Sequence, residues 1–285
     1  MNRPEKFPVS DSYRPQLSEA SAGLTHEVVA IDERGRRSAI HIPAERPLTV
    51  YVDKRELVTL MTLGGAPEAL TLGYLRNQRL VRDIADIVSV QVDWSVDAVA
   101  VVTRGGIADV EARTAKKVVT TGCGQGSVFG GLMDEVDTIS LPAEARLRQS
   151  VVYRIVDTIR TQQSIYKQAG SVHGCALFSN TGDLLYFVED VGRHNAVDAI
   201  AGLMWLDGVE GGDKVFYTTG RLTSEMVIKG AQMGIPFLLS RSGTTQMGHM
   251  VADKVGMSLL ARCSGTHFLL LAGAHRLQFE PELLM

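Results

Sequence analysis

Apolar and polar positions alternate along the first part of the chain in a way that predicts mostly strands. β-branched and other apolar residues recur at every second position, and short turns rich in charge or glycine separate the runs. One helix interrupts them, because Pro67 stands at a helix start and apolar residues follow it at helical spacing. The predicted strands cover 26–53 (as a hairpin or meander), 57–63, 87–94 and 96–103, and the predicted helix covers 67–81.

The second part of the chain alternates strands with helices. After Pro142, apolar residues at every fourth position predict an amphipathic helix that ends near Gln163. Short apolar runs then predict strands at 172–178, 184–188, 215–218, 237–239 and 258–261, with helices at 196–206, 225–233 and 246–255. This rhythm is typical of a layered α/β sheet, whose ligand sites lie at strand ends and helix N-termini.

These patterns predict an α/β (α+β) protein in which a layered α/β domain follows a smaller, mixed and largely β N-terminal region. We expect a flexible N-terminal arm at 1–25, the β-rich region at 26–141 and the α/β domain at 142–285, with a boundary near Pro142. Residues 115–134 hold too many glycines for either regular element, which predicts a mobile loop.

Cys123, between two glycines, is the thiol that this loop singles out. Glycines expose a sulfur, and consecutive backbone amides can stabilise a thiolate or persulfide anion. A buried structural thiol is the alternative, which the loop alone leaves open. Cys175 lies on an apolar strand and is expected in the core, while Cys263 is intermediate. Three cysteines without a compact zinc spacing predict reduced thiols and no bound metal.

Composition narrows the class of protein. The net charge of -3, from 29 basic and 32 acidic residues, lacks the basic footprint of a nucleic-acid-binding protein. No apolar run approaches the ~20 residues that span a bilayer, and the first 25 residues hold no apolar signal-peptide core. We therefore expect a cytoplasmic protein with neither a nucleic-acid nor a membrane partner.

Four polar segments follow or border predicted strands. Residues 189–195 combine two acids, an arginine, a histidine and an amide, as an active-site loop does, although a helix cap with a surface ion pair is the alternative. Residues 220–225 and 240–245 each place an arginine, hydroxyls and glycine before a helix, which favours phosphate; simple capping is the alternative. Residues 262–267 suit a polar ligand, and His173 is either hydrogen-bonded structure or functional.

Together these segments resemble the FdhD family of formate dehydrogenase accessory proteins, in order and at similar spacing from about Pro47 to Leu277. The most specific match is Glu189-Asp190-Val191-Gly192-Arg193-His194, followed by Ala196 and Asp198. The others are Thr121-Gly122-Cys123-Gly124, Gly170 with His173 and Ala176, Arg221 with Ser224-Glu225-Met226-Val227 and Lys229, and Thr244-Thr245.

The resemblance implies a sulfur carrier that takes sulfane sulfur from a cysteine desulfurase. The sulfur would pass to the molybdenum or tungsten bis(molybdopterin guanine dinucleotide) cofactor of formate dehydrogenase. The resemblance also implies a homodimer with a fold similar to cytidine deaminases. Carried over by position, Cys123 corresponds to the persulfide-bearing cysteine. The cofactor-binding stretch corresponds to Arg262, Cys263, Ser264, Gly265, Thr266 and His267.

The chain departs from the family pattern at two places. Gly126 stands where the family commonly has a second loop cysteine, so a dithiol mechanism in that loop is unavailable, and Thr266-His267 replace a common glycine-arginine pairing. A cofactor-binding chaperone without sulfur transfer is therefore an alternative function. A zinc-dependent nucleoside deaminase is a third hypothesis, but the chain lacks the His-x-Glu and Pro-Cys-x-x-Cys elements of that chemistry.

Overall fold

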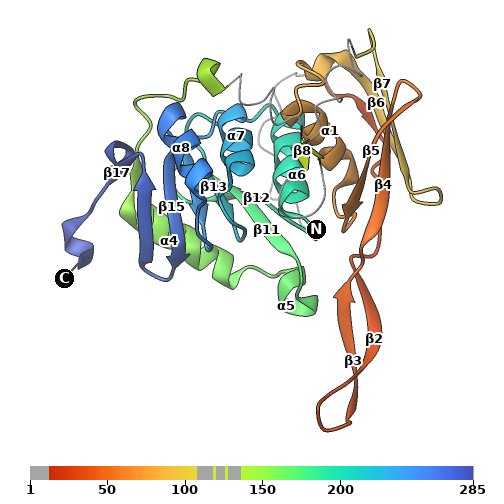
Figure 1. Ribbon diagram of the computed structural model, residues 1–285, viewed down its shortest axis with the longest axis horizontal. Coiled ribbons are helices and arrows are strands. Elements are labelled where there is room, and N and C mark those ends of the chain that lie inside the picture. The colour runs from red at the N-terminus through yellow and green to blue at the C-terminus, as the bar shows by residue number, and fades with distance from the viewer. Residues whose placement is uncertain (1–12, 108–117, 120–125, 128–135, 285) are drawn as a thin grey trace.

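The computed structural model describes residues 13–107, 118–119, 126–127 and 136–284 of the chain (Figure 1). Its architecture is mixed α/β, as the hydrophobic pattern predicts, with one five-stranded and one six-stranded sheet. In the described part of the chain, no helix is both long enough and apolar enough to cross a membrane.

The five-stranded sheet is built from the N-terminal strands in the order β1-β6-β7-β4-β5. Its strands are β1 (Gln16–Leu17), β4 (Arg46–Val52), β5 (Arg55–Thr62), β6 (Ile87–Asp93) and β7 (Ala98–Thr103). Leu48, Val50 and Val52 alternate inward along β4, so one face of the sheet is buried as the period of two predicts. Residues 16–17, inside the predicted N-terminal arm, pair with β6.

Helix α1 (Pro67–Asn77) carries proline at its start and ends earlier than the predicted Val81. The physical reason is Arg79, whose φ of 57° leaves the right-handed region, so the helix cannot continue through it. Glu68 in the first turn accepts hydrogen bonds from Ser18 Oγ at 2.6 Å and from the Ala20 amide at 2.7 Å. These contacts hold the chain before β2 against α1.

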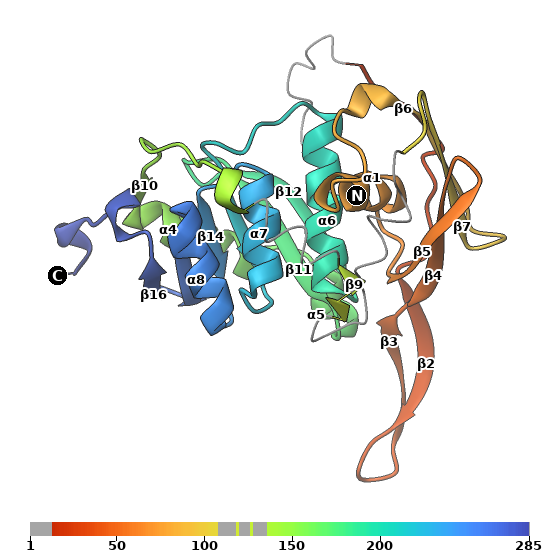
Figure 2. The same ribbon diagram turned by 45° about the horizontal axis from the view of Figure 1, so that its top comes forward.

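The β2–β3 hairpin projects from the body of the molecule, as both Figure 1 and Figure 2 show. Strands β2 (Thr25–Ile31) and β3 (Arg37–Pro43) pair antiparallel along their full length, around the turn predicted at residues 34–37. We refer to residues 25–43 as the projecting hairpin.

The six-stranded sheet has the order β12-β11-β13-β14-β15-β16. Its strands are β11 (His173–Phe178), β12 (Leu184–Asp190), β13 (Val215–Thr218), β14 (Phe237–Ser240), β15 (Ser258–Ser264) and β16 (His267–Ala272). The central strands β13, β14 and β15 are parallel to one another, while β11, β12 and β16 complete the sheet in antiparallel pairings.

Helices cover both faces of this sheet. The helices after the N-terminal half are α4 (Gln149–Thr161), α5 (Ile165–Ala169), α6 (Arg193–Leu206), α7 (Ser224–Gln232) and α8 (Gln246–Val255). Phe178 and Tyr217 pack with α4 residues in one core cluster, whereas Leu177 and Phe216 pack with α6 and α7 residues in a larger one. Adjacent strand residues thus enter opposite cores, and the sheet forms the middle layer of three.

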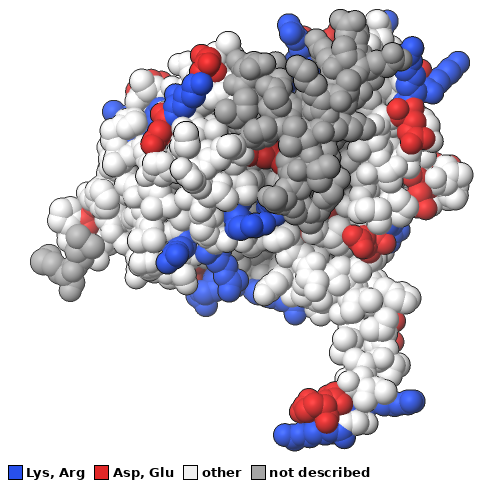
Figure 3. All heavy atoms as spheres, in the orientation of Figure 1, with Lys and Arg blue, Asp and Glu red and all other residues white. Residues whose placement is uncertain are grey.

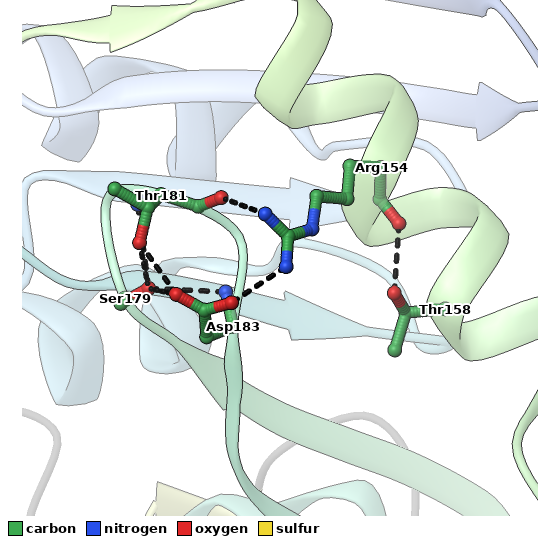
Figure 4. Close-up of polar contacts among 5 residues, drawn as sticks. All are labelled: Arg154, Thr158, Ser179, Thr181 and Asp183. Atoms are coloured by element: carbon green, nitrogen blue, oxygen red, sulfur yellow. Dashed lines mark hydrogen bonds and ion pairs between the residues drawn. The ribbon is translucent and has the colours of Figure 1, made fainter.

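The α4 helix is tied to the predicted turn between β11 and β12 (Figure 4). Arg154 Nη2 donates to Asp183 Oδ1 at 2.6 Å and Nη1 donates to the Thr181 carbonyl at 3.0 Å. Thr181 Oγ1 donates to Asp183 Oδ2 at 2.6 Å, and the Asp183 amide donates to Ser179 Oγ at 3.0 Å. The short polar turn is therefore closed on itself and fastened to the helix that covers it.

The larger core cluster joins the two halves of the chain. It contains Leu48 and Leu72 from the N-terminal half as well as Ile200 and Leu259 from beyond Pro142. Gly73 of α1 and Gly202 of α6 allow these helices to touch, because a Cβ on either glycine would collide with a carbonyl oxygen of the other helix. The predicted limits of 26–141 and 142–285 stay a prediction.

Candidate functional site at the carboxyl edge of the sheet

The carboxyl ends of β13, β14 and β15 meet at one edge of the six-stranded sheet, because these strands are parallel. Helix α7 begins at Ser224 after β13, and α8 begins at Gln246 after β14. Both helix N-termini therefore open on the same edge. Such edges hold ligands in many α/β folds, because unpaired backbone amides and the positive ends of helix dipoles gather there.

The loops at this edge are fastened to one another by backbone hydrogen bonds. The Leu222 amide donates to the Gly243 carbonyl at 2.9 Å, and the Thr245 amide donates back to the Leu222 carbonyl at 3.2 Å. The Arg262 amide donates to the Ser242 carbonyl at 2.8 Å. The two segments that the sequence paired by their similar composition are thus neighbours, and residues 262–267 lie beside them.

Arginines give this edge a positive surface. Arg221, Arg241 and Arg262 are exposed, one from each of the three loops. In Figure 3, Lys and Arg side chains gather on the lower part of the face, where the carboxyl ends of these strands lie in Figure 1. Guanidinium groups beside helix N-termini favour phosphate and other anions, because planar donors and backbone amides can bind the same oxygens.

His173 at the start of β11 and Arg193 at the start of α6 border the same edge. Arg193 is buried, and its side chain packs against Gly220, where a Cβ would lie only 2.8 Å from Arg193 Cδ. Burial lowers the pKa of His173, and the charges of Arg193 and Arg221 lower it further. His173 is therefore a neutral imidazole among arginines at neutral pH, available as a hydrogen-bonding group rather than as a cation.

The turn before α6 is organised by the carboxylate of Asp190. It accepts hydrogen bonds from Thr62 Oγ1 at 2.5 Å, the Leu63 amide at 3.0 Å, the Gly192 amide at 3.1 Å and Asn195 Nδ2 at 2.8 Å. Burial raises the pKa of Asp190, while these four donors oppose the shift. Residues 189–195, which the sequence indicates as a possible active-site loop, thus connect the end of β5 to the start of α6.

A network of buried polar side chains connects α6 with α7 and α1. His194 Nε2 lies 3.3 Å from Glu225 Oε2. Lys229 Nζ lies 3.8 Å from Glu225 Oε1 and donates to Asp198 Oδ2 at 2.8 Å, and Asn77 Nδ2 donates to Asp198 Oδ1 at 2.7 Å. Burial, followed by the charges of Lys229 and Arg193, lowers the pKa of His194 to about 2, so its imidazole is neutral.

The sequence alone did not predict that these buried polar side chains form one connected network. The available signal was a charged residue within an apolar stretch, such as Lys229 between Ile228 and Gly230 on α7. A lone charge at a helix position that should be buried requires a partner, because an unpaired buried charge is strongly destabilising.

Residues 262–267 form the end of β15 and its turn into β16. Arg262 has a φ of 54° and Gly265 a φ of 57°, so the backbone turns sharply and presents short polar side chains outward. Arg262, Ser264, Gly265, Thr266 and His267 are exposed. Cys263 points the other way, into the core cluster under α4, and its Sγ lies 3.5 Å from the Leu260 carbonyl.

Both described cysteines are poor nucleophiles at neutral pH. Burial raises the pKa of Cys175 to about 12 and that of Cys263 to about 11, and the thiolate is the reactive form. Cys175 is in the core, as expected, with its Sγ 3.4 Å from Thr218 Oγ1. Cys123 lies outside the described residues. The described strands on either side of it in sequence, β8 (Val118–Val119) and β9 (Gly126–Ser127), pair antiparallel.

Within the described ranges, no group of three or more His, Cys, Asp or Glu side chains is arranged to hold a metal ion. The donors that the carboxyl edge offers are guanidinium groups, hydroxyls and backbone amides. This donor set suits the phosphates of a nucleotide-containing ligand.

Fold and site together define a layered α/β protein with an arginine-rich strand edge. The FdhD/NarQ family model matches residues 43–278, so the chain belongs to the FdhD/NarQ family. A solved structure described as that of a formate dehydrogenase accessory protein from Desulfotalea psychrophila superimposes with a TM-score of 0.71. It has 25% sequence identity, and the match covers 89% of this chain and 98% of that one.

Curated relatives carry a consistent name. A sulfur carrier protein FdhD from Listeria monocytogenes is 27% identical to the chain, over 89% of the chain and 98% of the relative. Another from Saccharolobus solfataricus is 28% identical, over 82% and 90%. A third, from Sulfurisphaera tokodaii, is 30% identical, over 80% and 88%.

Proposed function

We propose that the chain is a cytoplasmic sulfur carrier for the maturation of a formate dehydrogenase, with Cys123 as its sulfur-bearing thiol. The observation that carries this proposal is the match to curated sulfur carriers over nearly their whole length. The chemistry of the thiols agrees with it. Cys175 and Cys263 are buried with pKa values of about 12 and 11, which makes them unsuitable as attacking groups and directs the proposal to Cys123.

In the proposed reaction, the Cys123 thiolate attacks the outer sulfur of a persulfide on a cysteine desulfurase. A sulfur–sulfur bond forms at Cys123 while the donor's sulfur–sulfur bond breaks, so the donor cysteine leaves as a thiolate. Cys123 then holds one persulfide sulfur. The acceptor is the molybdenum or tungsten atom of bis(molybdopterin guanine dinucleotide), which is the substrate of the second transfer.

The carboxyl edge supports binding of that substrate. Its phosphates would meet Arg241 and Arg262 together with the amide donors at the start of α8, and the guanine would meet the short polar residues 264–267. Cys263 would contribute to this binding surface through its backbone atoms, because its thiol faces the core. Arg193 and His173 extend the polar surface on the other side of the α7 loop.

The test is maturation of a formate dehydrogenase in cells that lack the native carrier. We expect the unaltered chain to restore formate-dependent activity and Cys123→Ala to abolish it, while Cys263→Ala, which alters a buried thiol, retains it. Full activity with Cys123→Ala would contradict the proposal.

A second function is favoured by one specific observation, the presence of Gly126 where the family commonly has another cysteine. In that alternative the chain binds the cofactor and protects it without transferring sulfur. Binding of the cofactor by Cys123→Ala together with restored enzyme activity would support the chaperone and exclude the carrier.

A further inference from the structure

The pairing of β11 with β13 brings His173 beside the loop that carries Arg221. At the carboxyl edge, the Thr219 amide donates to the Gly174 carbonyl at 2.9 Å, and the Gly174 amide donates to Thr219 Oγ1 at 3.0 Å. Because the two strands are antiparallel, the residue before Gly174 lies next to the residue after Thr219. His173 is therefore adjacent to Gly220, which directly precedes Arg221 in the chain.

Arg193, at the start of α6, adds a positive charge beside these two residues. It is 5% exposed, and its side chain lies against Gly220, where a Cβ would be 2.8 Å from Arg193 Cδ. The charges of Arg193 and Arg221 both act on the imidazole of His173. The start of β11, the start of α6 and the loop after β13 thus bring two guanidinium groups close to one imidazole.

Two of these side chains have donors that no described residue uses. Within the described ranges, Arg221 forms no ion pair and the imidazole of His173 makes no hydrogen bond. Asp190, which pairs with His173 across β11 and β12, already accepts hydrogen bonds from four donors. Glu189 accepts from two backbone amides of α5. A cluster of cationic and neutral donors without a counter-charge favours an anion.

We propose that His173 and Arg221 bind a phosphoryl group, with Arg193 supplying a nearby charge, in a subsite separate from the nucleotide site after β14 and β15. A guanidinium and an imidazole N–H can donate to two oxygens of the same group. The proposal rests on the proposed function only in that both use the carboxyl edge. A failure to bind phosphate would therefore not contradict sulfur transfer by Cys123.

The order of the strands separates this subsite from Arg262. Strands β13 and β14 lie between β11 and β15, so three strand spacings separate His173 from the end of β15, or roughly 14 Å. One phosphoryl group cannot contact both ends of that distance. The loop between them is held in place, because Ser240 Oγ donates to the Gly220 carbonyl at 2.6 Å and the Gly220 amide donates to Thr218 Oγ1 at 3.1 Å. The two subsites can therefore be occupied together.

Binding of a dianion should change the protonation of His173. Burial lowers the pKa of its imidazole, and the charges of Arg193 and Arg221 lower it further. A bound dianion opposes the two arginines, so the pKa of His173 should rise when the subsite is filled. His194, its titratable neighbour on α6, has a pKa of about 2 and stays neutral. The imidazole signal of His173 therefore reports occupancy of this subsite.

The test follows the histidine signals of the full chain by NMR while inorganic phosphate is added, with sodium chloride keeping the ionic strength constant. The signal that is lost in His173→Gln is assigned to His173. We expect phosphate to move this signal and to raise the pKa of His173. Arg221→Ala should weaken phosphate binding about tenfold, as for the loss of one charged hydrogen bond.

Two arginine variants serve as matched controls. Arg82→Ala removes an exposed arginine from the segment after α1, and Arg262→Ala removes one from the neighbouring nucleotide site. Both should leave the affinity for phosphate unchanged, because screening by salt is strong beyond about 10 Å. A phosphate response of His173 that Arg262→Ala abolishes would merge the two subsites into one and overturn the proposal.

A parallel titration with GDP identifies the source of the phosphoryl group. If GDP moves the His173 signal in Arg262→Ala as it does in the unaltered chain, the group belongs to a nucleotide. If phosphate alone moves the signal, the group is free phosphate. Both results support the subsite, whereas a His173 signal that responds to neither anion would overturn it. Full affinity for phosphate in Arg221→Ala would overturn it as well.

Calorimetry of the unaltered chain provides a second measurement in case Arg221→Ala does not fold. Sulfate is the probe, because it stays a dianion at pH 6 and does not itself exchange protons there. Titrations in two buffers with different ionisation enthalpies give the number of protons taken up on binding. We expect proton uptake, because a filled subsite raises the pKa of His173. Absence of sulfate binding, or binding without proton uptake, would equally overturn the proposal.

Discussion

Lys229 Nζ lies 2.8 Å from Asp198 Oδ2, and both side chains are at least 99% buried. This pair joins α7 to α6, and Asn77 on α1 completes it by donating to the other oxygen of Asp198. We expect Lys229→Met to lower the free energy of unfolding by about 3–5 kcal/mol, because it leaves the Asp198 carboxylate buried without its cation. Urea unfolding followed by circular dichroism measures the loss.

The combined variant Lys229→Met with Asp198→Asn distinguishes pairing from simple packing. Because the double replacement removes the uncompensated charge, we expect it to be less destabilising than the sum of the two single variants. Strict additivity of the two losses would show that the side chains do not depend on each other.

His194 should make the protein acid-sensitive. Its folded pKa is about 2, far below the usual value near 6.5, so the unfolded chain takes up a proton at His194 that the folded chain refuses. His194 makes its full contribution to the free energy of unfolding at pH values above its pKa in the unfolded chain. This contribution falls as the pH decreases below that pKa. Between pH 7.5 and pH 5 the loss amounts to about 2 kcal/mol.

The variant His194→Gln isolates this effect because glutamine does not titrate. We expect its unfolding free energy, measured in urea at pH 7.5 and pH 5, to fall by about 2 kcal/mol less than that of the unaltered chain. An equal fall in both proteins would assign the acid sensitivity to other groups.

The contact between α1 and α6 depends on glycine. A Cβ on Gly73 would collide with the Asp198 carbonyl oxygen, so Gly73→Ala must push the two helices apart. Alanine gains about 1 kcal/mol in helix propensity, but the clash should cost about 3 kcal/mol or more, and the clash dominates. Thermal unfolding measures the difference. Gly105→Ala is the control, since nothing lies within 4 Å of its Cβ position, and a loss there equal to that at Gly73 would refute the steric explanation.

Arg241 and Arg262 should contribute to binding of guanine nucleotides at the carboxyl edge. With GDP as the probe, we expect calorimetry to show about tenfold weaker binding for Arg262→Ala and for Arg241→Ala, as for the loss of one charged hydrogen bond. Arg82→Ala removes an exposed arginine from the segment after α1 and should leave the affinity unchanged. Equal affinities for all these variants would place the ligand elsewhere.

Local sequence patterns predicted much of the fold. Alternation predicted β5, β6 and β7, and the turn at 180–183 was predicted from its polar residues. The start of the helix after Pro142 was harder to predict. Leu147 fits the helical period, but it lies in a two-residue strand, β10 (Leu147–Arg148), that pairs with β17 (Leu277–Gln278). No local pattern can show such a pairing across 130 residues.

The sequence predicted separate segments of the candidate site but not how they are arranged. Similar composition indicated that 220–225 and 240–245 belong together, and the Leu222–Gly243 hydrogen bond joins them. The orientation of Cys263 was not foreseen, because the irregular pairing between Ala261 and Ser264 changes which face each residue takes. The link from His194 through Glu225 to Lys229 depends on how α6 and α7 pack, which spacing within one helix does not determine.

Mass spectrometry of Cys123 tests the central claim most directly. The chain is incubated with a cysteine desulfurase and cysteine, alkylated and digested. The proposed function predicts that the peptide carrying Cys123 gains the mass of one sulfur, that dithiothreitol removes this sulfur, and that the peptides carrying Cys175 and Cys263 gain none. A Cys123 peptide without added sulfur, under conditions in which the desulfurase itself carries a persulfide, would contradict the account.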